Sequence, residues 1–535
     1  MVFKEHIFKI SLALILLLTG LLCIYAIYNY HGDVAPTRIR SGPVNFLPDE
    51  RNRLPVTQNQ IPGGQLSIPN SRQHMAPPPN GRMGGRITMA GANYASWLAI
   101  YSITFLALFI AAYYLYIYKK IKIHPGNESI LILTLLCTGL LLRISVSTLI
   151  EGHPFDINTF KSWATAAANN LLEVYSNRSI DYPPLYIYIL FLIGKTAGFA
   201  AMSPYFTLLL KLPSIITDIA TSYLIYKLAR KYLTPEISIL ISAFYIFNPA
   251  VFINSTFWGQ VDSFFTFIVI SAVILLAEKR IAFAAALFTA AVMMKPQGII
   301  FLPVLFFELV REKSPGSFLK AAVFALGTAA IIILPFSLNH GVLWIEKLFS
   351  NTIAEYPYAS VNAFNFFCLI GKNYTRDTAT LFIFSYHTWG MIFIVVVTAL
   401  SWFIYIKGNN RIFASAAALL LIAGVFTFST RMHERYLFPA AALSILTFIY
   451  LRDKRLLLLS AGFSTTIYIN THFILFEAGN GINSVFFKPA LIITSLLNVL
   501  LFVYLVKVLF DIAIKKRGAS LHQVFKPKSR SPAIR

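Results

Sequence analysis

The residue best placed to do chemistry in this sequence is an aspartate that directly follows an apolar run. Asp156 stands in the stretch HPFDIN, just after that run ends. A carboxylate can accept a proton from a hydroxyl group as a general base, and at an ordinary pKa of about 3.9 it is already ionised at neutral pH. The same residue could instead be a solvated loop end.

A dense charged cluster lies much later in the chain. The stretch RMHERY places Arg431, His433, Glu434 and Arg435 between two apolar runs. Because arginine binds phosphate oxygens through paired N–H donors, two arginines and a histidine predict a phosphate clamp, with Glu434 orienting Arg435. The alternative is simple anchoring at a membrane surface.

Two further polar pairs interrupt apolar sequence. Gln260 and Asp262 lie in WGQVDS, and Lys295 and Gln297 lie in KPQG. Ionisable groups at membrane depth are costly and are usually functional. Lys295 would offer a point charge to phosphate, and Gln297 a donor to phosphate or a sugar hydroxyl. Alternatives are an N-cap role for Asp262 and a lysine that extends to the membrane surface.

Aromatic and amide residues accompany these charges. Tyr182 lies in DYPPL, and Tyr356 and Asn362 lie in EYPYASVNAFN. Rings that stack and amides that exchange hydrogen bonds suit a carbohydrate. The alternatives are a plain helix start at DYPPL and an aromatic belt at a membrane interface.

The composition shows in what kind of protein these residues must be positioned. Of the 535 residues 57% are hydrophobic and only 13% are charged, with a mean hydropathy of +0.66. Apolar runs long enough to cross a bilayer recur about 14 times. We therefore expect an all-α, polytopic transmembrane helical bundle. Residues at helical spacing behind Asp156 predict an interfacial helix in the first outer loop, and a second is expected at about 341–353. The residues of the first are Phe160, Trp163, Ala167, Leu171 and Leu172.

Composition also divides the chain into five regions. We expect a transmembrane anchor over 1–28, a flexible Pro/Arg-rich linker over 29–90, a catalytic transmembrane core over 91–450, further transmembrane helices over 451–512 and a basic tail over 513–535. Residues 183–211 predict a re-entrant segment or two short crossings. Residues 281–311 predict two short helices that meet at the KPQG break.

The formal charge of +23 does not indicate nucleic acid, because lysine and arginine sit in short clusters between apolar runs. Such clusters are retained on the cytoplasmic side of a membrane. Placing them inside puts both termini in the cytoplasm. It also brings the polar motifs above together on the extracytoplasmic face. The sequence contains neither a phosphate-binding Gly-rich loop nor an HExxH motif, and its three cysteines do not form a framework.

Taken in order, these motifs resemble those of the integral-membrane glycosyltransferases of the GT-C class, particularly prokaryotic relatives of the dolichyl-phosphate-dependent glucosyl- and mannosyltransferases. The resemblance runs over about 128–450 and rests on the outer-loop aspartate, YPPL, KLP with LAR, NP…WGQVDS, KPQ, YPY…NAFN and MHERYLFP. It implies a polyprenyl-phosphate-linked sugar donor, an extracytoplasmic site and inverting transfer. By position, Asp156 corresponds to the catalytic base.

Some members of that class carry paired acids in the first loop, where this chain has Asn158. A divalent metal is therefore possible but not supported, and no other cofactor is expected. The predicted function is transfer of mannose or another hexose to a lipid, glycan or protein acceptor. A transporter or flippase of lipid-linked sugars or of an envelope polysaccharide precursor is the alternative, but it would need polar groups through the whole membrane depth. A non-catalytic scaffold would leave the outer cluster unexplained.

Overall fold

The computed structural model describes residues 2–30, 32, 90–119, 122–176, 180–341, 343–477 and 489–514. The linker expected over 29–90 and the basic tail expected over 513–535 lie almost entirely outside these residues. Within them the chain is all-α, apart from a two-residue hairpin of β1 (Thr380–Leu381) and β2 (Phe384–Ser385), in which Thr380 pairs with Ser385.

The first half of the fold carries the residues around Asp156. Its elements are α1 (Val2–Tyr28), α2 (Ala90–Lys119), η1 (Pro125–Asn127), α3 (Glu128–Ser147), α4 (Pro154–Asn169), α5 (Pro184–Ala197), η2 (Ser203–Tyr205), α6 (Phe206–Tyr232), α7 (Pro235–Ile246), α8 (Pro249–Phe252), the π-helix η3 (Ile253–Trp258) and α9 (Asp262–Ala277).

The second half begins with the helix pair on either side of KPQG. Its elements are α10 (Ile281–Met294), η4 (Pro296–Phe301), α11 (Leu302–Glu312), α12 (Pro315–Ser337), α13 (Trp344–Ala354), α14 (Phe366–Leu369), α15 (Tyr386–Gly408), α16 (Phe413–Phe428), α17 (Pro439–Leu451), α18 (Arg455–Glu477) and α19 (Pro489–Ile514).

The protein is an integral membrane protein by the length and composition of its helices. Eight helices of the described ranges are long and apolar enough to cross a membrane, and five more apolar helices are shorter. The expected count of about 14 spans is not shown. The shorter helices include α9, α16 and α17, of 16, 16 and 13 residues. At 1.5 Å per residue these are shorter than a hydrocarbon core of about 30 Å.

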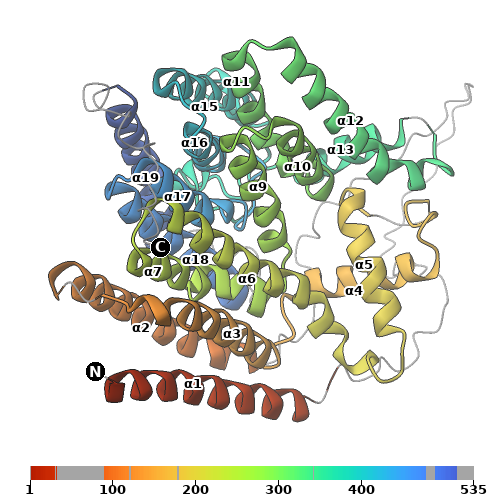
Figure 1. The fold of residues 1–535 in the computed structure, drawn as a ribbon. Coiled ribbons are helices and arrows are strands. Elements are labelled where there is room, and N and C mark those ends of the chain that lie inside the picture. Colours follow the sequence, from red (N-terminus) through yellow and green to blue (C-terminus); the bar gives the residue numbers. More distant parts are fainter. Residues whose placement is uncertain are drawn as a thin grey trace, which may run out of the picture.

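The core of the bundle is formed by helices that other helices cover. Every residue of α16 from Phe413 to Thr427 is buried, and α17 is buried from Pro439 to Tyr450. Both pack against α9, which in turn packs against α6 and α10 (Figure 1). The residues at the ends of these central helices are therefore held in a rigid frame.

Helices α4 and α5 pack closely on each other beside this frame (Figure 1). At Gly194 the backbone of α5 lies so near the Ala164 carbonyl of α4 that an added Cβ would be only 2.1 Å from its oxygen. Phe160, Trp163 and Ala167 are buried, as their helical spacing predicts. Leu171 and Leu172 follow the end of α4 rather than continuing it.

The breaks between helices agree only in part with expectation. Residues 281–311 form two short helices separated at η4, as predicted. For residues 183–211 the helix bounds do not decide between a re-entrant segment and two short crossings. These residues form the short helix α5 followed by the start of α6, which continues through Pro213 to Tyr232. The later expected interface helix is α13, none of whose residues is buried.

Candidate active site

Asp156 lies in the first turn of α4, not in the loop before it. Pro154 opens the helix, where its missing N–H leaves no bond unmade, and an acidic side chain is favourable in the first turn. The Asp156 side chain is 15% exposed. Its Oδ2 accepts hydrogen bonds from the Trp258 indole Nε1 at 2.6 Å and from Arg435 Nη1 at 3.0 Å. The carboxylate is therefore held in one orientation.

The indole of Trp258 contacts His153 and Arg435 as well as Asp156. The His153 ring stacks on it with centroids 4.8 Å apart and planes inclined by 13°. The Arg435 guanidinium lies 4.8 Å from the centre of the Trp258 ring. His153 Nδ1 is itself 3.5 Å from Asp156 Oδ2. Trp258 therefore fixes the donors that surround Asp156 as well as donating to it.

A second buried ion pair lies beside the first. Asp262 is the first residue of α9, and its Oδ1 accepts a hydrogen bond of 2.5 Å from Lys295 Nζ, at the end of α10. Asn254 donates to Asp262 Oδ2 at 3.0 Å. Arg435 Nε is 3.8 Å from the same oxygen, which places Arg435 between the two carboxylates. Asp262 is thus a partner of Lys295 and not an N-cap, and Lys295 is buried and does not extend to a surface.

The segment 431–436 brings in the remaining charges, but it does so unequally. Arg435 Nη1 also lies 3.0 Å from Glu434 Oε1, as expected if Glu434 orients Arg435. Arg431 does not join this cluster: its Nε bonds Asp377 Oδ2 at 2.7 Å and its Nη1 bonds the Ile353 carbonyl at 3.0 Å. The predicted clamp is therefore divided, with Arg431 tied to a neighbouring loop.

His433 occupies the centre of this segment and is largely buried. The Tyr356 ring packs edge-on against the His433 ring with centroids 4.7 Å apart, and the centroid of the Tyr436 ring lies 5.1 Å from that of His433. The His433 backbone forms bridges to Val361 and Asn362. Asn362 has a positive φ of 56°, and Asn373 and Tyr374 hold its side chain. Asn362 thus shapes the loop that supports His433.

The three remaining predicted residues line the same cluster. The Tyr182 ring lies 5.4 Å from Lys295 Nζ, the side chain of Gln260 is turned toward Asp156, and that of Gln297 lies against the Tyr436 hydroxyl. Apart from Arg431, the residues predicted from sequence therefore converge, directly or through one neighbour, on Arg435 and His433.

Burial and charge together set the protonation of this cluster. Burial raises the pKa of Asp156, but Arg435, His153 and the indole N–H outweigh it and leave that pKa below its usual range. Burial and the neighbouring Arg435 together lower the pKa of His433 to about 3, so the imidazole is neutral at neutral pH. Burial raises the pKa of Glu434 and lowers that of Lys295. The carboxylates around Arg435 raise its pKa against its burial, so Arg435 is the strongest fixed positive charge of the cluster.

Several residues of the site were not predicted from sequence. Trp258, His153 and Asn254 contact the two carboxylates, and Asp181 faces Glu355 at the margin of the cluster. Trp258 lies within WGQVDS and Asn254 lies just before it. Their closeness in sequence to Gln260 and Asp262 was the signal that could have identified them. Asp377, the partner of Arg431, had no signal of this kind.

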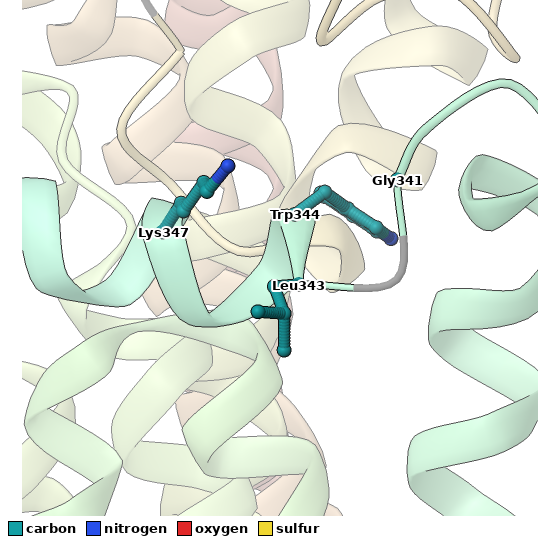
Figure 2. A pocket seen from close by; sticks show the side chains of 4 residues that line it. All are labelled: Gly341, Leu343, Trp344 and Lys347. Atoms are coloured by element: carbon teal, nitrogen blue, oxygen red, sulfur yellow. The ribbon is translucent and has the colours of Figure 1, made fainter.

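Two cavities of the described chain lie outside this cluster. One of about 380 Å³ is bordered by Gly341 and by the side chains of Leu343, Trp344 and Lys347, which point in different directions at the start of α13 (Figure 2). The other, of about 430 Å³, is almost wholly apolar and lies between α1, α3 and α6. Neither is lined by a predicted site residue.

The chemistry of the site is that of carboxylates held by cations. Within the described residues no group of three or more histidine, cysteine, aspartate or glutamate side chains is arranged to hold a metal ion. The cluster instead offers an ionised carboxylate, a neutral imidazole and two cations at one end of a helical bundle. No family model matches this chain, and no curated protein matches it either.

Proposed function

We propose that this protein is an inverting glycosyltransferase of the GT-C class that moves a hexose from a polyprenyl-phosphate donor to an extracytoplasmic acceptor. The observation that carries the proposal is the carboxylate of Asp156, which is ionised, oriented through Oδ2 by two donors and placed beside two buried cations. A base next to cations is what a displacement with a phosphate leaving group requires.

In the proposed reaction an acceptor hydroxyl oxygen attacks the anomeric carbon of the donor sugar. The bond from that carbon to the phosphate oxygen breaks, and the phosphate leaves with the electron pair. Asp156 takes the hydroxyl proton, and we assign that transfer to Oδ1, since the hydrogen bonds from Trp258 and Arg435 both reach Oδ2. A single displacement of this kind inverts the configuration at the anomeric carbon.

The low pKa of Asp156 favours proton transfer late in the reaction. A weak base accepts the proton only after the new bond has made the hydroxyl acidic. Until then the negative carboxylate can stabilise positive charge at the sugar, because glycosyl transfer passes through an oxocarbenium-like state. A carboxylate with a depressed pKa therefore suits both roles.

The leaving phosphate would meet Arg435 and Lys295, which now pair with Asp156 and Asp262. His433 is neutral, so it would act as a hydrogen-bond donor to phosphate and not as a cation. Tyr182, Tyr356, Gln260 and Gln297 supply rings and amides for the sugar. Arg431 is left with a role in holding the loop.

The test uses purified protein in bilayers with radiolabelled polyprenyl-phosphate hexoses and total lipid or glycan acceptors. We expect Asp156→Asn to abolish transfer while donor binding is retained, because the amide keeps the shape and cannot take the proton. Glu173→Gln, an exposed carboxylate of the same outer segment, is the matched control and should remain active. Full activity of Asp156→Asn would overturn the assignment of the base.

A flippase of lipid-linked sugars is the competing function, and the same preparation distinguishes it. Such a protein would move the labelled lipid between leaflets of a vesicle without forming a new glycosidic bond. Movement without transfer in the wild-type protein would therefore refute the enzyme and support the transporter.

A further inference from the structure

An ion pair lies fully buried in the bundle, outside the cluster described above. Arg143 on α3 and Asp218 on α6 approach with Nε 3.3 Å from Oδ2, and both side chains are 0% exposed. Removing two charges from water costs several kcal/mol for each ion, and ionisable groups at membrane depth are usually functional. Stability alone is therefore a poor account of this pair.

The pair contacts the chain segment that leads to Trp258. The Arg143 guanidinium lies 5.0 Å from the centre of the Phe252 ring, at the end of α8. The Asp218 carboxylate lies near the side chains of Ser255, within η3, and Ser263, at the start of α9, and its Oδ1 has no hydrogen-bond partner among the described residues. The buried pair is thus adjacent to the segment before, within and after the π-helix.

That π-helix has an unusual geometry with a direct effect on Asp156. A π-helix is rare and is often found at functional sites. It ends at Gly259, whose φ of +83° favours glycine and whose added Cβ would lie 2.6 Å from Ile157 of α4. The backbone N–H groups of Gly259 and Gln260 both bond the Asn254 carbonyl at 3.1 Å. This turn is what directs the Trp258 indole at Asp156 Oδ2.

We propose that Arg143 and Asp218 are positioning residues that hold the π-helical turn and so keep Trp258 aimed at Asp156. Neither residue touches the reacting groups. Their contribution to turnover rests on the proposed function, whereas their effect on Trp258 does not. The pair therefore forms a supporting layer behind the base.

The test follows Trp258 by fluorine NMR of full-length protein labelled with 5-fluorotryptophan in bilayer nanodiscs. Loss of one resonance in Trp258→Phe assigns it among the six tryptophans of the chain. The main variant is Arg143→Met with Asp218→Leu, because replacing a whole buried pair by apolar residues of similar size is often tolerated. Arg143→Gln with Asp218→Asn, which removes both charges and keeps polar side chains of similar shape, is the second variant should the first fail to fold.

A matched control exists in the same two helices. Glu128 of α3 pairs with Arg230 of α6 near the other ends of both helices, and both side chains are partly exposed. Glu128→Gln with Arg230→Met therefore removes an α3–α6 ion pair that does not touch η3. It should leave the Trp258 resonance in place.

The expected result is a shifted Trp258 resonance in the Arg143/Asp218 variants only, with the other tryptophan resonances unmoved. In transfer assays kcat should fall about tenfold at an unchanged KM for the donor, as for loss of one charge-assisted hydrogen bond to the base. An unmoved Trp258 resonance, or an equal shift in the control, would overturn the proposal. If the Trp258 resonance shifts in the variants while the wild-type protein shows no transfer, the positioning role of Arg143 and Asp218 is upheld and the proposed function is refuted.

Discussion

Two clusters in this protein bury carboxylates against arginine, and they satisfy these carboxylates in different ways. Glu308 of α11 is 0% exposed, and Arg311, one turn later, bonds both of its oxygens at 2.8 Å. Tyr405 and Arg411 donate to the same carboxylate. Donors from three places thus serve one acid, which is the arrangement of a closed structural site.

The cluster around Asp156 is less complete. Three carboxylates, those of Asp156, Asp262 and Glu434, lie within 4 Å of the single guanidinium of Arg435. Four buried polar atoms of this cluster, His153 Nδ1, Asn254 Oδ1, Gln260 Nε2 and Arg435 Nε, have no hydrogen-bond partner among the described residues. A buried polar atom without a partner is costly. The comparison therefore contrasts a carboxylate that its own donors satisfy with a cluster whose hydrogen-bonding groups are not all paired, which is compatible with the proposed role of that cluster in binding a substrate.

The largest effect should follow from neutralising the two acids in turn. We expect Asp156→Asn to reduce kcat by about 10³-fold with little loss of stability, within the range usual for a general base. Turnover measured in bilayers, together with the unfolding midpoint, checks this. If Asp156→Asn loses stability and keeps its turnover, Asp156 is a structural carboxylate and not a catalytic one.

Glu308→Gln should do the opposite. Removing one partner of a buried ion pair leaves the arginines uncompensated, and we expect a loss of about 3 kcal/mol of stability. Turnover per folded molecule should stay at the wild-type value. Denaturant unfolding measures the first quantity, and activity normalised to the folded fraction measures the second.

A smaller effect is expected for Trp258→Phe, which removes the indole donor and keeps the ring. The lost hydrogen bond to a charged acceptor should lower kcat about tenfold. Because the indole N–H lowers the pKa of Asp156, its removal raises that pKa. Activity is lost as the pH falls through this pKa, so the acidic limb of the rate profile should move to higher pH. A limb that stays in place would show that the indole does not act on the base.

The smallest effect should come from the acid pair at the margin of the site. Burial and the facing Glu355 raise the pKa of Asp181 to about 8. A carboxyl whose folded-state pKa is raised loses stability as the pH rises from the unfolded value near 4 through about 8. Glu355 is exposed, so water will weaken the effect. Hydrogen-exchange protection factors of 180–183 and 352–356, which correct for the intrinsic rise of exchange with pH, should fall toward pH 8 in the wild type. They should fall less in Glu355→Gln, where burial alone raises the Asp181 pKa.

Much of the site could be predicted because its residue types are conspicuous in apolar sequence. Asp262 and Lys295 stand out as charges among apolar residues, and the structure pairs them. Pro154 could also have placed Asp156 in a first helical turn, since proline is common there. The start of α4 could therefore have been predicted from local sequence, although the helix was expected only behind Asp156.

The rest depended on partners distant in sequence. Arg431 was assigned to the phosphate clamp because nothing in its own segment reveals Asp377, which lies in another loop. Arg143 and Asp218 lie in the apolar helices α3 and α6, where each alone suggests no pairing. The count of about 14 spans is not shown, because an apolar run does not distinguish a lipid-facing helix from one such as α16, which other helices bury.

The contact between Asp156 and Arg435 joins residues 279 positions apart, and this separation determines when the site can form during synthesis. At about 5–20 residues per second, a ribosome completes Arg435 tens of seconds after Asp156. During that interval α4 exists without the cation that compensates its carboxylate. Asp156 therefore acquires its low pKa only when the last third of the chain inserts. A nascent or truncated protein contains this buried aspartate but lacks the arginine that keeps it ionised.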